Sequence, residues 1–121
     1  MTNQSTLIIG DKSSTTTVVF SNYKHVTEEM AINMFSIPIQ RDIIHTLLAE
    51  GEKSIKQLAA ILPYDQGNIY RFVKKLRDEL AIRISRKDGR EYFYDVNYAF
   101  FKAAKNIVTE VFDNVIESEN K

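Results

Sequence analysis

Residues 64–96 read YDQGNIYRFVKKLRDELAIRISRKDGREYFYDV, and the spacing of the apolar residues changes within this stretch. In its first half, apolar side chains recur every three or four positions from Ile69 onward, which is the period of an amphipathic helix. Asp65 precedes them and belongs to the residue types that cap helices best. The first half therefore predicts a helix that runs from Asp65 to about Leu80.

In the second half of the stretch the period falls to two, which predicts a pair of strands. Asp88–Gly89 lies between the strands and is a dipeptide favoured in type I′ turns, where both central residues need a positive φ. Counted outward from that turn, Ile84 faces Phe93 across the strands. The second half therefore predicts a β-hairpin with an apolar contact on one side.

Three further helices are expected before this stretch. The first begins at a Thr27 cap and ends before Pro38, which disfavours helix at the residue that precedes it. The second runs from Pro38 to Gly51, and the third begins at a Ser54 cap and ends at Pro63. Because the third helix and the helix that follows it are separated by a very short turn, the two predict a helix-turn-helix.

The ends of the chain carry different signals. From Tyr98 to about Ile116 the apolar period is again helical, whereas residues 1–22 hold two short β-branched stretches that fit either a hairpin or an arm. The predicted fold class is mainly α with a small β-hairpin. We expect an N-terminal arm or short hairpin over 1–26, one folded domain over 27–117 and a disordered tail over 118–121.

Composition restricts the class of protein. The chain has 121 residues, of which 44% are hydrophobic and 26% charged, as in an ordinary soluble domain. No stretch approaches the roughly 20 apolar residues that span a membrane, so no membrane partner is expected. The first ten residues lack the features of a secretory signal, which favours a cytoplasmic, nucleoid-associated location. The absence of cysteine excludes disulfides and cysteine-ligated metal sites.

Charge is unevenly distributed along the chain. The formal net charge is zero, but residues 71–90 hold eight basic residues and three acidic ones, which gives this segment a net charge of +5. A solvated charged helix beside a charged turn explains most clusters of this kind. The alternative is a surface that binds an anion such as the DNA backbone.

The order helix, helix, turn, helix and basic-tipped hairpin resembles the winged helix-turn-helix of ArsR-like and MarR-like repressors. The similarity extends over roughly 38–116 and is most convincing over 54–96. It rests on the polar opening Gln66–Asn68 of the last of these helices, on its apolar stripe, and on the sequence from Arg86 to Arg90 followed by the aromatic residues Tyr92–Tyr94. The resemblance implies a winged helix-turn-helix with N- and C-terminal dimerisation helices that binds double-stranded DNA.

Two features depart from that family pattern. Relatives usually place a glycine just after the recognition helix, whereas this chain has Leu80–Ala81 there. Metal-sensing relatives use cysteine and paired histidine ligands, whereas this chain has no cysteine and only His25 and His45. We therefore expect no metal sensing by that route, no metal and no cofactor. Whether a small-molecule effector binds stays open.

The outward face of the helix over 65–80 is the predicted reading surface. A helix fits the major groove of DNA, and its first residues reach the base edges. Asn and Gln can pair with adenine and Arg with guanine, which assigns base reading to Gln66, Asn68 and Arg71. Lys74 and Lys75 are assigned to phosphates.

Other DNA contacts are expected beside this face. The hairpin residues Arg86, Lys87 and Arg90 are assigned to an adjacent minor groove or to the backbone. Each assignment has a structural alternative, because Arg86 can pair with Glu91 and Lys74 with Asp78. Tyr70 fits a groove contact and a half-buried position equally well.

The last helix carries more apolar surface than one small domain readily covers. We expect it to form a homodimer, together with residues 27–35, so that two recognition helices read half-sites about one DNA turn apart. The predicted interface residues are Phe100, Ala104, Ile107, Val108, Val111, Phe112 and Val115.

The function predicted from sequence is that of a dimeric, sequence-specific DNA-binding regulator of transcription, with repression as the expected action. No phosphate loop, nucleophile motif or metal-ligand cluster points to an enzyme. Two alternatives stay open at this point. One is a DNA-binding scaffold, such as a plasmid-partition or architectural protein, and the other is a winged helix used only for protein contacts.

Overall fold

The structure is a computed structural model, and it describes residues 23–119. Most of the predicted arm, residues 1–22, lies outside the described residues. The described residues form two compact units, which we treat separately. The central unit comprises Ile32–Tyr98, and the flanking unit comprises residues 23–31 and 99–119.

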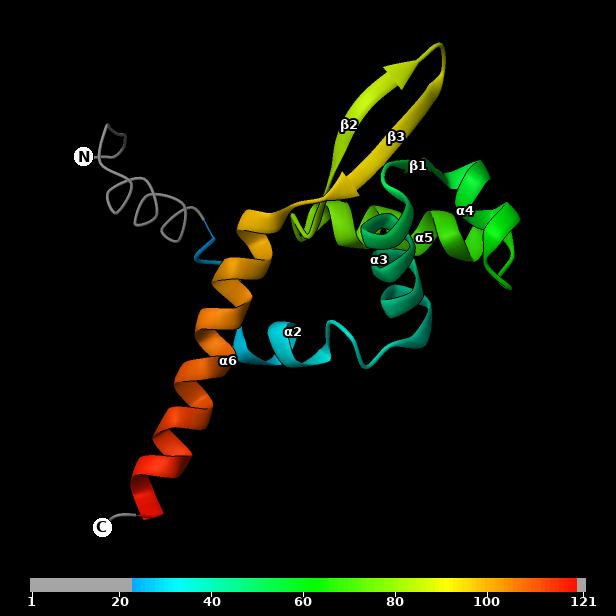
Figure 1. Cartoon of the computed structure of the whole chain (residues 1–121). Helices are drawn as coiled ribbons and strands as arrows, with labels where there is room; N and C mark the ends of the chain where they lie inside the picture. Colours follow the sequence, from blue (N-terminus) through cyan, green and yellow to red (C-terminus); the bar gives the residue numbers. More distant parts are fainter. Residues whose placement is uncertain (1–22, 120–121) are drawn as a thin grey trace, which may run out of the picture. The chain divides into compact units, whose positions relative to one another are not determined.

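The central unit has the element order of a winged helix-turn-helix (Figure 1). Its fold confirms the predicted class of a mainly α protein with a small hairpin. The elements are α3 (Pro38–Glu50), β1 (Lys53–Ser54), α4 (Ile55–Ile61), α5 (Gln66–Asp78), β2 (Ile82–Asp88) and β3 (Glu91–Val96). We call the hairpin of β2 and β3 the wing.

The helix starts are set locally, as the sequence predicted. Pro38 occupies the first turn of α3, where its missing N–H costs nothing. Ser54 and Gln57 form a reciprocal capping box at the start of α4. Asp65 caps α5, with 2.8 Å between its Oδ1 and the amide nitrogen of Asn68. A short turn over 62–65 separates the end of α4 from the start of α5, and the two helices with this turn form the helix-turn-helix.

The core of the central unit is formed by apolar side chains from α3, α4, α5 and the wing. Each large aliphatic side chain that is fully buried contributes roughly 1.5–3 kcal/mol relative to an exposed one. α5 contacts α3, α4 and β2, so its buried stripe lies at the centre of this core. The side chains that are at most 1% exposed include Ile43, Ile44, Leu47, Leu58, Ile69, Val73, Leu76 and Ile82.

The sheet has three antiparallel strands in the order β1-β3-β2. β1 was not predicted, because a strand of two residues has no readable period. It pairs with β3 at the base of the wing, where Lys53 lies opposite Tyr94 and Ser54 opposite Phe93. This pairing connects the wing to the residues just before α4.

The predicted pairing of the two wing strands was wrong, both at the turn and farther along the strands. Asp88 pairs with Glu91, so the turn consists of Gly89 and Arg90 instead of Asp88 and Gly89. Only Gly89 has a positive φ there, at 63°, and a turn with glycine in the first central position needs no second such residue. Further along, a bulge between Ile84 and Arg86 shifts the pairing again.

As a result of that bulge, Ile84 pairs with Tyr94, and Arg86 takes the predicted place of Ile84 opposite Phe93. The apolar contact expected across the hairpin is therefore replaced by a contact between an arginine and an aromatic ring.

The flanking unit contains α6 (Tyr98–Glu119) from Ala99 onward and the beginning of α2 (Glu28–Asn33). Thr27 Oγ1 accepts a hydrogen bond of 3.1 Å from the Met30 amide, as predicted for a cap. Phe100 is fully buried, and its ring centroid lies 6.4 Å from those of Tyr23 and His25. Within the described residues, no helix is both long and apolar enough to cross a membrane.

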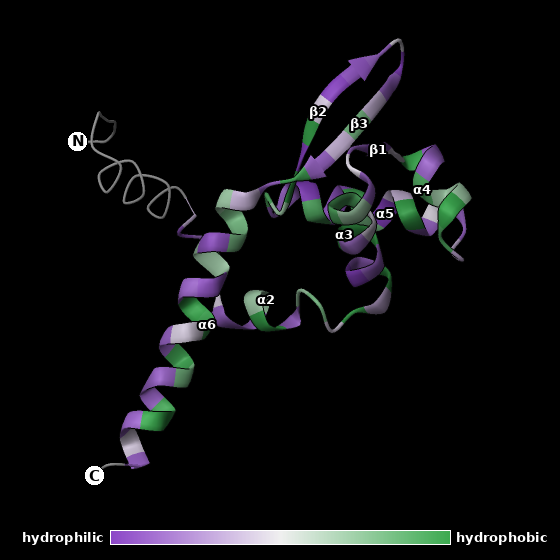
Figure 2. Ribbon diagram, viewed as in Figure 1, coloured by the Kyte–Doolittle hydropathy of each residue, from purple (hydrophilic) through white to green (hydrophobic). Residues whose placement is uncertain are grey.

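α6 continues to Glu119, which is two residues into the stretch 118–121 predicted as a tail. Ser118 donates a hydrogen bond from its hydroxyl to the Asn114 carbonyl, 2.9 Å away, and this bond closes the last turn. Hydrophobic and hydrophilic residues alternate along the helix (Figure 2).

The end of α5 shows how the chain manages without the family's glycine. Leu80 adopts φ 69° and is the only non-glycine residue with a positive φ in the described chain. The Ala81 amide donates to the Leu76 carbonyl and the Leu80 amide to that of Arg77, both at 2.9 Å. This is the Schellman pattern that normally ends with glycine. A leucine in this conformation costs roughly 1–2 kcal/mol.

Replacing Leu80 with glycine is therefore expected to stabilise the protein by about 1 kcal/mol, because glycine adopts this φ without the steric cost. Urea unfolding followed by circular dichroism measures the change. Leu80→Ala is the matched control, since it removes the same partly exposed side chain but keeps a Cβ. Equal stabilities of the two variants would show that the left-handed residue is not strained.

Candidate nucleic-acid interface

The outward face of α5 is exposed, as its period predicted. Ile69, Val73 and Leu76 point into the core, which turns the polar residues of the helix outward. Tyr70 is 56% exposed and therefore does not belong to the core. The other predicted contact residues of this helix are Gln66, Arg71, Lys74 and Lys75, which are exposed, and Asn68, which is partly exposed.

Three of the residues at the start of α5 are joined by hydrogen bonds. Asp65 Oδ2 accepts a bond of 2.9 Å from the Asn68 side-chain amide. Asn68 Oδ1 in turn accepts one of 2.7 Å from Arg71 Nη2. The Arg71 guanidinium also lies 5.2 Å from the centre of the Phe72 ring. The side chain of Arg71 is thus oriented before any ligand arrives.

The two lysines of α5 differ in their surroundings. Lys75 Nζ lies 2.9 Å from Gln40 Oε1 and 3.1 Å from a Glu79 carboxylate oxygen, so it connects α5 to α3. Gln40 is 1% exposed, which makes this a contact with the core that the sequence did not reveal. Lys74 has no hydrogen bond or ion pair among the described residues, and its predicted alternative partner Asp78 instead lies beside Arg77.

Midway along the wing, a carboxylate from the loop before β1 holds the bulge. Glu52 accepts hydrogen bonds from the Ser85 hydroxyl, at 2.6 Å, and from Arg86 Nε. The Arg86 guanidinium also lies 3.8 Å from the centre of the Phe93 ring. Two hydrogen bonds hold the pKa of Glu52 below its usual range. The bond from Ser85 has the larger effect and the bond from Arg86 the smaller one. We call this cluster the wing clamp.

The wing clamp gives Arg86 a structural partner that differs from the Glu91 considered from the sequence. Its assignment as a DNA contact stays a prediction. Among the residues in this cluster, only Arg86 had been predicted as a site residue, because Glu52 lies 34 positions away along the chain and no local pattern connects them.

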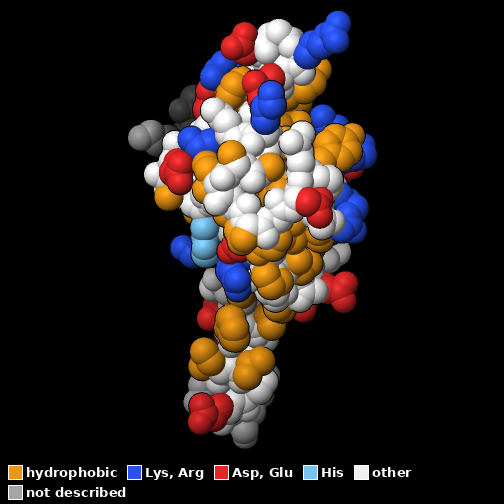
Figure 3. All heavy atoms as spheres, turned by 90° about the vertical axis from the view of Figure 1, so that its right-hand side faces the viewer, with side chains coloured by type: hydrophobic (Ala, Val, Ile, Leu, Met, Phe, Trp, Pro, Cys, Tyr) orange, Lys and Arg blue, Asp and Glu red, His pale blue; other side chains and the backbone are white. Residues whose placement is uncertain are grey.

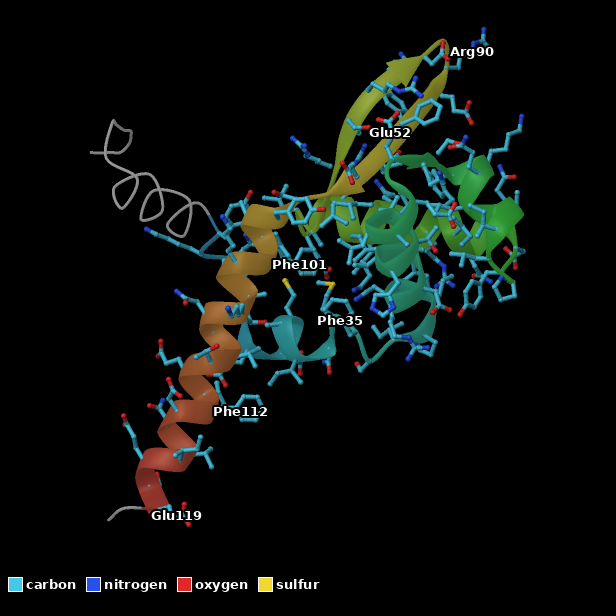
Figure 4. All side chains as sticks on the ribbon, viewed as in Figure 1. Phe35, Glu52, Arg90, Phe101, Phe112 and Glu119 are labelled. Atoms are coloured by element: carbon cyan, nitrogen blue, oxygen red, sulfur yellow. The ribbon has the colours of Figure 1, made fainter. Side chains whose placement is uncertain are left out.

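The tip of the wing carries its own cations. Lys87 Nζ lies 5.2 Å from the centre of the Tyr92 ring. Arg90 projects from the end of the hairpin (Figure 4), and it has no hydrogen bond or ion pair with the part of the chain that the structure describes. Figure 3 shows Lys and Arg side chains at the end of the wing and farther down the same face, beside exposed apolar side chains.

Between the start of α5 and the wing lies an open groove of about 850 Å³. Residues from α4, α5 and both strands of the wing line it, among them Lys56, Tyr70, Arg90 and Tyr92. Of these four, the sequence had singled out Tyr70 and Arg90 but not Lys56 and Tyr92. We call this feature the reading groove.

The predicted dimer residues on α6 fall into two sets. Phe100 and Ala104 are 0% and 7% exposed, so they are buried within the chain and the structure corrects their assignment to an interface. Phe112 and Val115 are 63% and 65% exposed (Figure 4 shows Phe112 on the side of α6), and Ile116, which was not predicted, is 60% exposed. Ile107, Val108 and Val111 are partly exposed.

Neither histidine belongs to a cluster of potential metal ligands. His45 stacks on Phe35, with ring centroids 5.7 Å apart, and His25 lies against Tyr23 and Phe100. Within residues 23–119, no group of three or more His, Cys, Asp or Glu side chains is arranged to hold a metal ion.

A crystal structure of an ArsR family transcriptional regulator has the same fold as this chain. The two are 20% identical, with a TM-score of 0.59 over 73% of this chain and 88% of the other. The likeness confirms the ArsR-like winged helix-turn-helix fold predicted from the sequence. No protein-family model and no curated protein matches the chain.

The wing clamp predicts a pH dependence. Because the pKa of Glu52 is lower in the folded protein, its stabilising effect is complete above the ordinary glutamate pKa of about 4.3 and is lost as the pH falls through the lower folded value. Glu52→Gln should therefore be less stable than the parent at neutral pH. Since a protonated Glu52 resembles glutamine, the difference should shrink toward zero as the pH falls below 4.

Unfolding free energies of the parent and of Glu52→Gln, measured from neutral to acidic pH, test this prediction. Glu50→Gln is the control, because Glu50 carries the same charge but only makes a weak pair with Lys53 at 3.8 Å. A stability difference for Glu52→Gln that stays constant with pH would contradict the ionic role of Glu52.

Proposed function

We propose that this protein is a double-stranded DNA-binding regulator of transcription, which reads the major groove with α5 and the minor groove or the backbone with the wing. The observation that carries the proposal is the oriented arginine at the exposed start of α5. Arg71 is positioned by Asn68 and Asp65, and it lies on a helix whose opposite face is fixed in the core. The matching fold of an ArsR family transcriptional regulator supports the proposal.

The three polar residues at the start of α5 are proposed to have different tasks. Arg71 has the fork of donors that fits the two acceptors of guanine. Asn68 already shares its side chain with Asp65 and Arg71, so it acts chiefly by orienting that arginine. Gln66 is exposed, and its amide is proposed to pair with adenine.

The lysines and the wing are proposed to bind the DNA backbone. Lys74 is exposed and available for a phosphate, whereas Lys75 must share its ammonium with Gln40 and Glu79. Arg90 at the wing tip and Lys87 beside it are proposed to enter the adjacent minor groove, where positive charge and groove width decide binding.

The exposed face of α6 is proposed to be the homodimer interface. Phe112, Val115 and Ile116 are each at least 60% exposed, which is more apolar surface than a helix in water normally shows. The charges on this helix are segregated. Lys102 and Lys105 lie in its first half, and the acidic residues Glu110, Asp113, Glu117 and Glu119 lie in its second half.

An antiparallel pair of α6 helices would place each basic half beside an acidic half, whereas a parallel pair would place like charges together. A two-fold dimer of this kind reads two half-sites of a symmetric operator.

The first test is binding to a pool of random duplex DNA, with selection of the bound sequences and fluorescence anisotropy at about 50 and 200 mM salt. The parent is expected to select a two-fold-symmetric site and to weaken steeply with salt, because bound phosphates release counterions. Arg71→Ala should lose about 1–3 kcal/mol at the selected site and relax its preference at one base pair in each half-site.

Lys24→Ala is the matched control for this experiment. Lys24 is exposed in the flanking unit and has no partner among the described residues, so its loss removes one positive charge that none of the proposed DNA contacts uses. Weak, unselective binding that is the same for the parent and Arg71→Ala would overturn the proposal in favour of a protein-contact role.

The proposed dimer is tested by sedimentation at micromolar concentration. The double variant Phe112→Ser and Val115→Ser should shift the protein from dimer to monomer, because each substitution removes an exposed apolar side chain. Asn114→Ser is the control, since two residues along a helix place it about 200° away from Phe112. A monomeric parent would show that α6 does not form this interface.

A further inference from the structure

The reading groove has the size and the lining of a small-molecule site. Its volume of about 850 Å³ lies within the range of roughly 300–1,000 Å³ that ligand pockets usually have. Three tyrosines line it, namely Tyr70 on α5 and Tyr92 and Tyr94 on β3. Aromatic side chains with a few polar groups are the usual lining of such pockets. The groove can therefore hold a ligand that is much smaller than DNA.

Tyr94 supplies a largely buried polar group to the groove. The residue is 6% exposed, and its hydroxyl has no hydrogen-bond partner among residues 23–119. A buried hydroxyl without a partner costs free energy, so the site favours a molecule that supplies one. Burial raises the pKa of Tyr94, Arg77 acts against this rise, and the phenol groups of Tyr70 and Tyr92 add to it. The three phenols thus lie close enough to one another to interact.

Two carboxylates lie opposite each other at the end of the wing and also line the groove. Asp88 pairs with Glu91 across the hairpin, and neither side chain has a hydrogen bond or an ion pair within the described part of the chain. Like charges directly opposite each other on paired strands are destabilising. Because carboxylates also repel phosphates, the proposed DNA contacts do not explain this pair. A bound cation would relieve the repulsion between the two carboxylates.

Aromatic rings beside carboxylates suit an organic cation. The face of a tyrosine ring attracts a cation within about 6 Å of its centre, and aromatic cages bind ammonium groups in this way. Tyr92 already makes such a contact, because the Lys87 ammonium lies 5.2 Å from the centre of its ring. Lys87 does not line the groove and Tyr92 is 40% exposed, so part of this ring remains open to a ligand there.

Two basic residues also line the groove, and they influence how a ligand would lie. Arg90 projects from the end of the hairpin (Figure 4), whereas Lys56 belongs to α4, on another wall. A cationic group is therefore expected beside the acidic pair of the wing, with the ring of the ligand against Tyr70 and Tyr92. An anionic ligand would instead bind at Lys56, and probes of opposite charge separate the two cases.

We propose that the reading groove is an effector site for an aromatic organic cation, whose charged group binds Asp88 and Glu91 and whose ring packs against Tyr70 and Tyr92. A polar substituent on that ring would be the missing partner of the Tyr94 hydroxyl. The consequence for regulation rests on the proposed function. Because Tyr70 also lies on the exposed face of α5, a ligand in the groove would compete with DNA.

The test follows the ring signals of ¹³C-tyrosine-labelled protein by NMR, in the absence of DNA. The three probes share a phenol ring and differ in charge, since tyramine is a cation, tyrosol is neutral and 4-hydroxyphenylacetate is an anion. Tyramine should bind severalfold more tightly than tyrosol, and the anion should bind most weakly. The signals of Tyr70, Tyr92 and Tyr94 should shift, whereas those of Tyr64 and Tyr98, which do not line the groove, should stay in place.

Variants connect binding to the acidic pair and to the rings. The double variant Asp88→Asn and Glu91→Gln should reduce the affinity for tyramine to that for tyrosol. Tyr92→Leu should weaken tyramine binding severalfold, because it removes one ring. The matched controls Glu50→Gln and Tyr98→Leu remove an exposed carboxylate and an exposed ring outside the groove, and they should bind tyramine as the parent does. Thermal unfolding shows whether each variant remains folded.

Competition is then measured by fluorescence anisotropy on the operator that the parent selects. Tyramine at concentrations that saturate the groove should release the operator from the parent, but not from the double variant Asp88→Asn and Glu91→Gln. The anionic probe should not release it from either protein. If tyramine binds in the groove and the operator stays bound, the effector role is wrong.

The failure of this inference and the failure of the proposed function give different results. If tyramine binds no better than tyrosol, or shifts only tyrosines outside the groove, the inference is wrong and the proposed function stands. Tighter binding of the anion would also overturn it, because the groove would then be an anion site at Lys56. If tyramine binds as expected but the parent selects no DNA, the ligand site stands and the proposed function fails.

Discussion

Burial of one face of α5 is the constraint on which the rest of the site depends. Ile69, Val73 and Leu76 are at most 1% exposed, and the helix contacts α3, α4 and β2 at once, so it cannot rotate about its axis. The Lys75 to Gln40 hydrogen bond fixes the same rotation through a polar contact. Because the inward face is fixed, the outward direction of Arg71 follows from the helical period alone.

The position of the wing depends on two anchors outside the hairpin. At its base, the Asn97 amide donates to the Ala81 carbonyl at 3.0 Å, and its side chain donates to that of Leu80 at 2.7 Å. Midway along, Glu52 holds the bulge at Ser85 and Arg86. The reading groove exists because both anchors hold the wing beside α5, and the left-handed residue Leu80 turns the chain from the helix into β2.

Features that depend on neighbours in the chain were predictable from the sequence. The caps at Ser54 and Asp65, the ends of the helices and the presence of a hairpin all follow from local residue types. The wing register was not predictable, because Asp88–Gly89 and Gly89–Arg90 are both acceptable turns and the bulge at Ser85 is stabilised by Glu52 from another element. Lys56 and Tyr92 were missed for the same reason, since only the tertiary fold brings α4 and the wing to one groove. The burial of Phe100 likewise arises from the distant aromatic residues Tyr23 and His25.

The hydrogen-bonded series Asp65, Asn68 and Arg71 has a consequence for the balance between affinity and specificity. The Asp65 carboxylate is connected to the Arg71 guanidinium through the side chain of Asn68. Its negative charge partly compensates that of the arginine and so lowers the general attraction of Arg71 for phosphate. The same series removes much of the rotational freedom that the arginine would otherwise lose on binding. For the proposed function, this arrangement weakens unselective binding and favours the one base edge that matches the oriented fork. The acidic residues near the reading surface are therefore compatible with DNA recognition, even though the chain as a whole carries no net charge. Screening confines each charge to about 8 Å at physiological salt, so for the proposed DNA binding the local net charge of +5 over residues 71–90 matters more than the total charge of the chain.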